Sequence, residues 1–296
     1  MFKSGFIGII GRPNVGKSTL LNAVVGERIA ITTPKPQTTR NRITGIRNVP
    51  NGQMIFLDTP GIHRADTPLN QLMVGAATDA FRTADLLLLL VEAPAGVHRG
   101  DLAILRGLEK VRRPVILVVN KADLVPADTL PALTAAFRET FPFADALALS
   151  ALKERGIDAL LDTLWQLLPE GPPFFPEDQM TDRSERFVAA EIVREQVILL
   201  THKEIPYSTA VVVDTFREDE AKKLISIQAT IHVERDSQKG ILIGKKGSML
   251  KEIGTRARAD LERFFNAAVY LELFVKVSPG WTRDSGRLRE YGYAKD

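Results

Sequence analysis

The first half of the chain alternates short apolar runs with segments of helical spacing. The apolar runs, which predict strands, are residues 6–10, 54–57, 86–91, 115–119 and, more weakly, 146–149. They do not alternate with polar residues and they end in turn signals, which is typical of strands buried on both faces in a parallel sheet. The segments that predict helices between them are 18–25, 70–82, 101–110, 130–140 and 157–168. We therefore expect a doubly wound α/β domain with its active loops after the strands' carboxyl ends.

This pattern stops at residues 169–176, where four prolines fall within eight residues and exclude a continuous helix or central strand. Beyond this point the predicted order is helix, two strands, two helices and a strand. The corresponding ranges are 184–202, 207–216, 223–235, a short helix from 241, 248–265 and 268–277. We therefore expect a domain at residues 1–170, a linker at 171–183, and a smaller α+β domain at 184–296.

Composition agrees with two globular domains. The 296 residues are 45% hydrophobic and 25% charged, which excludes a disordered or collagenous chain. The sequence has no cysteine, so disulfides, thiolate catalysis and cysteine-ligated metals are excluded. Residues 1–11 lack the features of a secretion signal, and the run at 86–91 is far shorter than the ~20 residues of a membrane span. We expect a cytoplasmic protein that touches a membrane only from outside.

A phosphate-binding pattern follows the first predicted strand. The sequence GRPNVGKS at residues 11–18 matches G-x-x-x-x-G-K-[ST] and opens a predicted helix. Its glycines let backbone amides surround phosphate oxygens, and the helix N-terminus adds partial positive charge. Lys17 is expected to reach the β- and γ-phosphates and the Ser18 hydroxyl to ligate magnesium. The predicted contacts of this segment are Gly11, Arg12, Pro13, Asn14, Val15, Gly16, Lys17, Ser18 and Thr19.

Three further motifs follow predicted strands in a fixed order: DTPG at 58–61, NKAD at 120–123 and SAL at 150–152. Asp58 can hold magnesium through water, and the Gly61 amide can sense a γ-phosphate. The Asp123 carboxylate can accept two hydrogen bonds from guanine, whereas adenine offers the opposite pattern. The pattern predicts a guanine-nucleotide site. Its residues outside the phosphate loop are Asp58, Thr59, Pro60, Gly61, Asn120, Lys121, Asp123, Ser150, Ala151 and Leu152.

With these motifs, the first domain resembles translation-factor-type GTPases. In such proteins a segment like residues 35–40 is the first switch, and one of its threonines ligates magnesium; we favour Thr39 over Thr38. The resemblance implies Lys17, Thr39 and Gly61 as catalytic residues, and Ser18, Thr39 and Asp58 as magnesium ligands.

One position departs from the pattern of many small GTPases. Ile62 stands where these often carry a glutamine that orients the attacking water, so we expect slow intrinsic hydrolysis. Asn14 is, in related GTPases, associated with a monovalent cation. The resemblance therefore suggests potassium as a cofactor in addition to magnesium.

The second domain concentrates basic charge around a G-x-x-G turn. Between residues 235 and 259 seven basic and two acidic residues give a net charge of +5, against +3 for the whole chain. Such a surface favours a nucleic-acid backbone. The element order and the turn resemble a KH domain of the prokaryotic type, type II, which clamps about four nucleotides. The predicted RNA-binding residues are Ile241, Ile243, Gly244, Lys245, Lys246, Gly247, Ser248, Met249 and Lys251, with Leu242 and Ile253 also expected to contact bases.

A GTPase domain followed by a KH domain, with the tail residues Gly280-Trp281 and Tyr291-Gly292-Tyr293, resembles the Era family over essentially the whole chain. The resemblance implies a GTP/GDP switch that binds the 3′ end of 16S ribosomal RNA and assists maturation of the 30S ribosomal subunit. It also implies peripheral contact with the inner face of the cytoplasmic membrane. We further expect a monomer.

Two alternatives follow from the same residues. In one, the basic second domain docks a protein or an anionic membrane in place of RNA. In the other, suggested by Ile62, the chain is a nucleotide-gated assembly factor with negligible turnover.

Overall fold

The computed structural model describes residues 1–35, 38–61, 68–109 and 111–293. The chain forms two compact units, which are described separately. The first contains Met1–Ala30, Thr39–Arg64 and Met73–Asp182, and the second contains Ile31–Thr38, Ala65–Leu72 and Arg183–Asp296. Two short segments of the N-terminal half therefore belong to the second unit.

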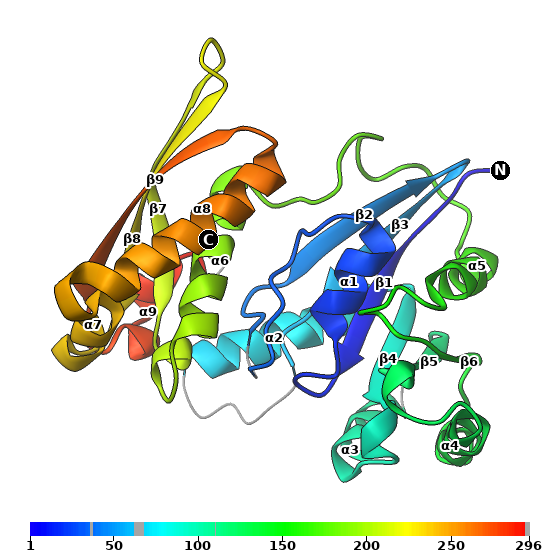
Figure 1. Cartoon of the computed structure of the whole chain (residues 1–296). Helices are drawn as coiled ribbons and strands as arrows, with labels where there is room; N and C mark the ends of the chain where they lie inside the picture. Colours follow the sequence, from blue (N-terminus) through cyan, green and yellow to red (C-terminus); the bar gives the residue numbers. More distant parts are fainter. Residues whose placement is uncertain (36–37, 62–67, 110, 294–296) are drawn as a thin grey trace. The chain divides into compact units, whose positions relative to one another are not determined.

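The first unit is built on a six-stranded sheet in the order β2-β3-β1-β4-β5-β6 (Figure 1). Its strands are β1 (Lys3–Gly11), β2 (Ile43–Val49), β3 (Gly52–Asp58), β4 (Leu86–Glu92), β5 (Val115–Asn120) and β6 (Asp145–Ala148). Neighbouring strands are parallel except for β2, which runs antiparallel to β3. The sheet confirms the predicted doubly wound α/β domain.

Helices bury both faces of this sheet. They are α1 (Lys17–Val25), α2 (Pro68–Thr83), α3 (Arg99–Leu108), α4 (Thr129–Arg138) and α5 (Ile157–Leu167). Leu87 and Leu89 of β4 pack with residues of α3 and α4, including Leu105 and Phe137. The alternate residue Leu88 points to the other face and is equally buried. Burial of both faces explains why these strands appear in the sequence as continuous apolar runs.

Strand β2 was not predicted. Its sequence ITGIRNV contains no continuous apolar run, and its last three residues are only half-buried. It lies at the edge of the sheet, where, in the described part of the chain, β3 is its one neighbouring strand and its outer side makes isolated contacts, such as those from the Ile46 amide to the Met180 carbonyl and between Gly45 and Thr181. An edge strand of this kind carries a weaker hydrophobic signal than a central one.

The second unit is an α+β domain with a three-stranded sheet in the order β7-β8-β9. Strand β8 is antiparallel to β7 and parallel to β9. Its elements are α6 (Glu185–Leu200), β7 (Ala210–Asp219), β8 (Leu224–Val233), α7 (Asp236–Ile243), α8 (Ser248–Phe265), β9 (Ala268–Val277) and α9 (Ser285–Glu290). The predicted bounds of α8 and β9 are correct; α7 begins at Asp236, ahead of the predicted start at residue 241, and α9 was not predicted.

One apolar core holds this unit together. Val193 of α6, Ile227 and Ile231 of β8, and Leu261 of α8 are fully buried in it. The core joins helices α6 and α8 to the sheet, so the apolar face of each helix packs against the strands. Among the described residues, none of the helices is both long and apolar enough to cross a membrane.

The tail after β9 packs against the end of the sheet around Trp281. The indole is fully buried, and its Nε1 donates a hydrogen bond to the Ser208 carbonyl at 3.1 Å. The ring lies 5.6 Å from the ring of Tyr291 and 5.7 Å from that of Tyr293, measured between centroids. The tail therefore completes the second unit's packing.

Replacing Trp281 by alanine should lower the free energy of unfolding of the second unit by about 3–5 kcal/mol, because a large buried ring and its hydrogen bond are lost. Phe274→Ala is the control: this β9 side chain is 48% exposed, and its loss should cost about 1 kcal/mol or less. Urea titration of the full chain, followed by circular dichroism, measures both. Equal midpoints for the two variants would contradict the packing role.

Candidate functional site

The phosphate loop joins the end of β1 to the start of α1 through backbone that only glycine adopts easily. Gly16 has φ +100°, and a Cβ there would lie 2.3 Å from the Asn120 Nδ2 atom. A Cβ on Gly11 would lie 2.5 Å from the Leu90 carbonyl oxygen. Glycine thus allows the loop to pack closely against the ends of β4 and β5 and to present its amides at the helix N-terminus.

Lys17, the first residue of α1, is buried within this loop. Its Nζ donates hydrogen bonds to the carbonyls of Gly11 at 3.2 Å and Arg12 at 2.9 Å. Burial lowers the pKa of Lys17 to about 8, although the nearby Asp58 carboxylate opposes the shift. The ammonium group is therefore positioned by the loop's own backbone.

Three oxygen-bearing side chains meet beside Lys17. Ser18 Oγ donates to Asp58 Oδ2 at 2.6 Å and lies 2.7 Å from Thr39 Oγ1, which in turn donates to the same carboxylate oxygen at 3.4 Å. Among the described residues, Asp58 Oδ1 has no hydrogen-bond partner although it is buried. Burial raises the pKa of Asp58.

Hydroxyl and carboxylate oxygens around an unsatisfied buried oxygen fit a hard cation such as Mg²⁺, whose remaining ligands would be water and phosphate. The structure brings Thr39 into this cluster, and the hydroxyl of the alternative residue, Thr38, donates to the Lys35 carbonyl at 2.8 Å instead.

The motifs after β3, β5 and β6 are connected to the phosphate loop. Asn120 Nδ2 donates to the Val15 carbonyl at 2.8 Å, and Asn120 Oδ1 accepts from the Ala151 amide at 3.0 Å. Lys121 Nζ donates to the Asn14 carbonyl at 2.9 Å. Asn120 therefore links the phosphate loop to the SAL segment through one buried side chain.

The carboxylate that the sequence predicts to select the base is accessible. Asp123 is exposed, and a hydrogen bond from the Ser150 side chain holds the pKa of Asp123 below its ordinary value. An ionised carboxylate only accepts hydrogen bonds, as contact with two guanine donors requires. Leu152 is 75% exposed, so its side chain does not pack into the core of the first unit.

The DTPG segment runs against the phosphate loop. Thr59 Oγ1 donates to the Ile9 carbonyl at 3.0 Å, Pro60 is buried, and a Cβ on Gly61 would lie 2.9 Å from Pro13. Ile62 lies outside the described residues. Thr19, like Pro13, is half-buried near the start of α1.

The segment just before Thr39 is fixed within the second unit by α6. Lys35 Nζ donates to the carbonyls of Ile198 and Thr201 at the carboxyl end of that helix. The fully buried Arg194 donates to the Thr38 carbonyl through Nη2. The Thr32 amide donates to Glu195 Oε1 at 2.9 Å. These contacts were not predicted from the sequence. The one local sign of them is Arg194, a charged residue among apolar positions of α6.

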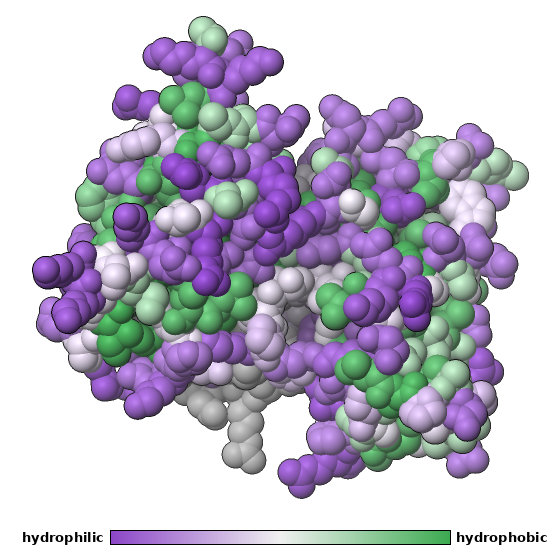
Figure 2. Space-filling view, viewed as in Figure 1, coloured by the Kyte–Doolittle hydropathy of each residue, from purple (hydrophilic) through white to green (hydrophobic). Residues whose placement is uncertain are grey.

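The G-x-x-G turn connects α7 to α8 and exposes its lysines. Lys246 adopts φ +52°, and Gly244 and Gly247 adopt φ +70° and +79°. Lys245, Lys246, Ser248 and Lys251 are exposed, and Ile241 is half-exposed, whereas Ile243 and Met249 are partly buried. Figure 2 shows hydrophilic residues gathered over the surface of α8.

Two expected base contacts were wrong. Leu242 and Ile253 are 0% exposed and belong to the apolar core of the second unit. Both lie on amphipathic helices whose inward stripes include these positions, so neighbouring residues in the sequence take different roles.

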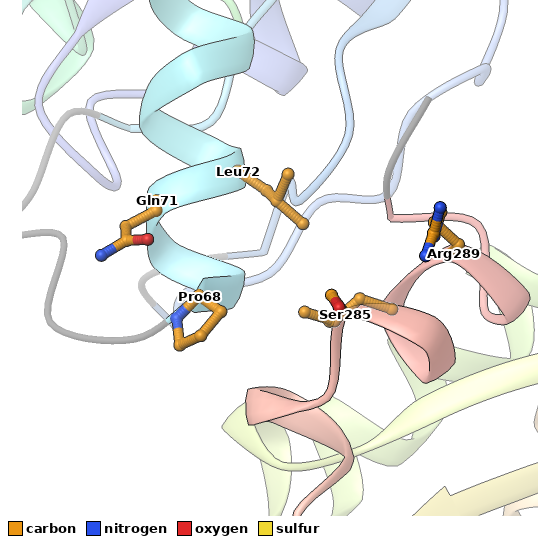
Figure 3. Close-up of a pocket in the computed structure, with 6 residues that line it drawn as sticks. Pro68, Gln71, Leu72, Ser285 and Arg289 are labelled. Atoms are coloured by element: carbon orange, nitrogen blue, oxygen red, sulfur yellow. The ribbon is translucent and has the colours of Figure 1, made fainter. Parts of the chain in front are cut away.

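The second unit also contains a cavity of about 400 Å³, lined from α2 by Pro68, Gln71 and Leu72 and from α9 by Ser285, Leu288 and Arg289 (Figure 3). None of the residues predicted to bind nucleotide or RNA lines it.

Comparison with known proteins decides the family. GTPase Era of Syntrophus aciditrophicus is 62% identical over 293 residues, which cover 99% of this chain and 96% of the relative. The chain belongs to the GTPase Era family. GTPase Era of Geobacter sp. strain M21 is 53% identical over 292 residues, covering 99% and 98% of the two chains. Residues 6–121 match a family described as 50S ribosome-binding GTPase, and residues 204–282 match the KH domain family.

Solved Era structures cover the whole chain as well. A crystal structure of Era in complex with MgGDPNP and nucleotides 1506–1542 of 16S ribosomal RNA has a TM-score of 0.95 and 42% identity, covering 100% of both chains. A variant of Aquifex aeolicus Era bound to GDP·AlF4⁻ has the same TM-score and identity, covering 99% and 100%. The family, the P-loop GTPase fold followed by a KH domain, and the GTPase activity are thereby confirmed.

GTP binding at pH 8.5, with Mg²⁺ saturating, should take up protons. In the free protein Lys17, with a pKa of about 8, is more than half deprotonated at that pH, whereas bound phosphates favour its ammonium form. Affinity should fall as pH rises above about 8, by at most about tenfold per pH unit, because one proton is coupled. Calorimetry in two buffers of different ionisation enthalpy measures the uptake. The heats in the two buffers should differ at pH 8.5 and should be nearly the same near pH 7. Identical heats at pH 8.5 would contradict the lowered pKa of Lys17.

Proposed function

We propose that this Era-family GTPase is a molecular switch that binds the 3′ region of 16S ribosomal RNA through its KH domain and assists maturation of the small ribosomal subunit. The observation that carries the switch is the oxygen cluster of Ser18, Thr39 and Asp58 beside the buried Lys17. The RNA complex of an Era relative supports the choice of ligand.

In the proposed reaction, water attacks the γ-phosphorus in line with its bond to the β–γ bridging oxygen. That bond breaks, GDP leaves, and the protons of the attacking water pass to phosphate and solvent, so that inorganic phosphate is released. Lys17 faces the β- and γ-phosphates, and the Gly61 amide contacts the γ-phosphate. Ser18 and Thr39 hold Mg²⁺ directly and Asp58 holds it through water. When bound, the metal supplies electrostatic stabilisation of the charge that develops on the phosphate oxygens. Ser18, Thr39 and Asp58 already lie within hydrogen-bond distance of one another, and preorganised polar groups lower a barrier effectively.

The switch acts through the chain connectivity at Thr39. Thr38, the preceding residue, is held by Arg194 of α6, and Lys35 is held at the end of the same helix. A γ-phosphate that draws Thr39 to the metal therefore acts on a residue whose chain neighbour, Thr38, is held by α6. We propose that the GTP state is the one competent for RNA and that hydrolysis releases it.

The RNA surface combines charge with apolar side chains. The exposed Lys245 and Lys246 meet phosphates, and the turn's left-handed backbone lets a sugar–phosphate chain approach closely. Ile241, Ile243 and Met249 offer partly exposed apolar groups to single-stranded bases.

Lys245→Glu/Lys246→Glu should weaken binding of a single-stranded RNA matching the 3′ region of 16S ribosomal RNA by at least about tenfold. Loss of two phosphate contacts should also reduce the slope of log affinity against log salt by about 1.4. The matched control is Lys222→Glu/Lys223→Glu at the β7–β8 turn, which exposes two neighbouring lysines of the same unit. Fluorescence anisotropy over a salt series gives both quantities.

The control should bind RNA with a slope close to that of the unaltered chain. Equal losses in both double variants would contradict a specific role for the G-x-x-G turn. The two lysines present the same charge to an anionic membrane surface, so vesicles of anionic lipid are the competing ligand. Unchanged RNA binding together with lost vesicle binding would favour peripheral membrane docking at this surface.

We also propose that potassium accelerates hydrolysis through Asn14, which is exposed in the phosphate loop at φ +65°. Phosphate release should be about tenfold faster in potassium than in sodium chloride, a difference of about 1.4 kcal/mol in barrier. Asn14→Gly keeps the left-handed backbone but removes the side-chain oxygen, so it should abolish the difference. Equal rates of the unaltered chain in both salts would contradict the proposal.

A further inference from the structure

A chain of charged side chains runs beside the phosphate loop in the first unit. Arg12 Nε donates to Asp101 Oδ1 at 2.8 Å, and Arg12 Nη2 lies 3.7 Å from Glu92 Oε1. Lys121 Nζ donates to Glu92 Oε2 at 2.5 Å. The two cations belong to the nucleotide motifs, whereas the two carboxylates belong to none of the motifs found in the sequence.

Asp101, in the first turn of α3, anchors one end of this chain. Its side chain is 0% exposed, and its Oδ2 atom has no hydrogen-bond partner among the described residues. Arg12 is therefore its main counter-charge, and separating the pair would leave a buried, unpaired carboxylate. The neighbouring Gly100 allows the close approach, since a Cβ there would lie 2.7 Å from Arg12 Cδ.

Glu92 stands between the two nucleotide motifs. It is the last residue of β4 and pairs in register with Asn120, the last residue of β5. One of its carboxylate oxygens faces Arg12 of the phosphate loop, and the other accepts from Lys121 of the NKAD motif. One side chain therefore bridges the phosphate-binding and base-binding segments.

The same two residues also take part in hydrogen bonds to the backbone of the phosphate loop. Lys121 Nζ also donates to the Asn14 carbonyl, and the Arg12 carbonyl accepts from Lys17 Nζ, both at 2.9 Å. Displacing Lys121 or Arg12 would thus move carbonyls that shape the loop and orient Lys17. Lys121 itself adopts φ +60°, a left-handed backbone conformation that is uncommon for a residue other than glycine.

We propose that Glu92 is a positioning residue for guanine-nucleotide binding. It keeps the phosphate loop and the NKAD motif at a fixed spacing, so that phosphates and base are bound together. It acts through Lys121 and Arg12, without contact to the nucleotide, and Asp101 fixes the far end of Arg12. The inference rests on the nucleotide site proposed above.

Glu92→Gln keeps the size of the side chain and removes its charge. We expect the rate of GDP dissociation to rise about tenfold, because variants that loosen a binding site change mainly the dissociation rate. Asp145→Asn is the matched control: Asp145 pairs with Arg138 on the surface of the same unit, where the two side chains are 40% and 53% exposed. Its effect should stay within about twofold. Stopped-flow measurement with a fluorescent GDP analogue gives the rates.

A double-mutant cycle separates positioning from general destabilisation. Because Lys121 makes the 2.5 Å contact to Glu92 and Arg12 only the 3.7 Å one, most of the Glu92→Gln effect should disappear in a Lys121→Met background. The variant Glu92→Gln/Lys121→Met should then release GDP at most about twofold faster than Lys121→Met alone. The inference would be overturned if Glu92→Gln still raised the GDP dissociation rate about tenfold in the Lys121→Met background. It would also be overturned if Glu92→Gln released GDP no faster than Asp145→Asn. Glu92→Asp, which keeps the charge on a shorter side chain, should give an intermediate rate and serves if Glu92→Gln does not fold. Failure of the unaltered chain to bind GDP would instead overturn the proposed function.

Discussion

The structure of the first unit depends on two opposite charges, Lys17 and Asp58, buried in one corner at the start of α1. Burial dominates both: it lowers the pKa of the lysine and raises that of the aspartate, so each charged form is less favourable than in water. Backbone carbonyls accept hydrogen bonds from Lys17, and the hydroxyls of Ser18 and Thr39 donate hydrogen bonds to Asp58. These bonds offset part of the free-energy cost of burying the two charges. We propose that a triphosphate and its metal bind in this preorganised corner and stabilise both charged forms further.

The sheet supplies this corner because its parallel strands end at one edge. β1, β3 and β5 deliver Gly11, Asp58 and Asn120 to the same end, and the Asn120 side chain then joins the phosphate loop to the segment after β6. The second unit uses a different principle, in which a glycine turn between two helices exposes adjacent lysines above an apolar core. The coupling between nucleotide and RNA is proposed to pass through the short segment before Thr39.

Much of this arrangement could be predicted from the sequence, since continuous apolar runs, glycines and polar strand ends are local signals. The α8 helix and the β9 strand were found with correct bounds for the same reason. What could not be predicted depends on partners distant in the sequence. The edge strand β2 lacks a two-sided hydrophobic pattern, Leu242 and Ile253 face the core, and the roles of Glu92 and Arg194 exist only through contacts made by folding.

The most direct test of the account is the affinity of the pure, full chain for GTP and for ATP, measured by titration calorimetry with magnesium present. Because the Asp123 carboxylate can accept hydrogen bonds from guanine but not pair with adenine, GTP should bind about 10⁴-fold more tightly. Equal affinities, or no heat with either nucleotide, would contradict a guanine-nucleotide site at the start of α1.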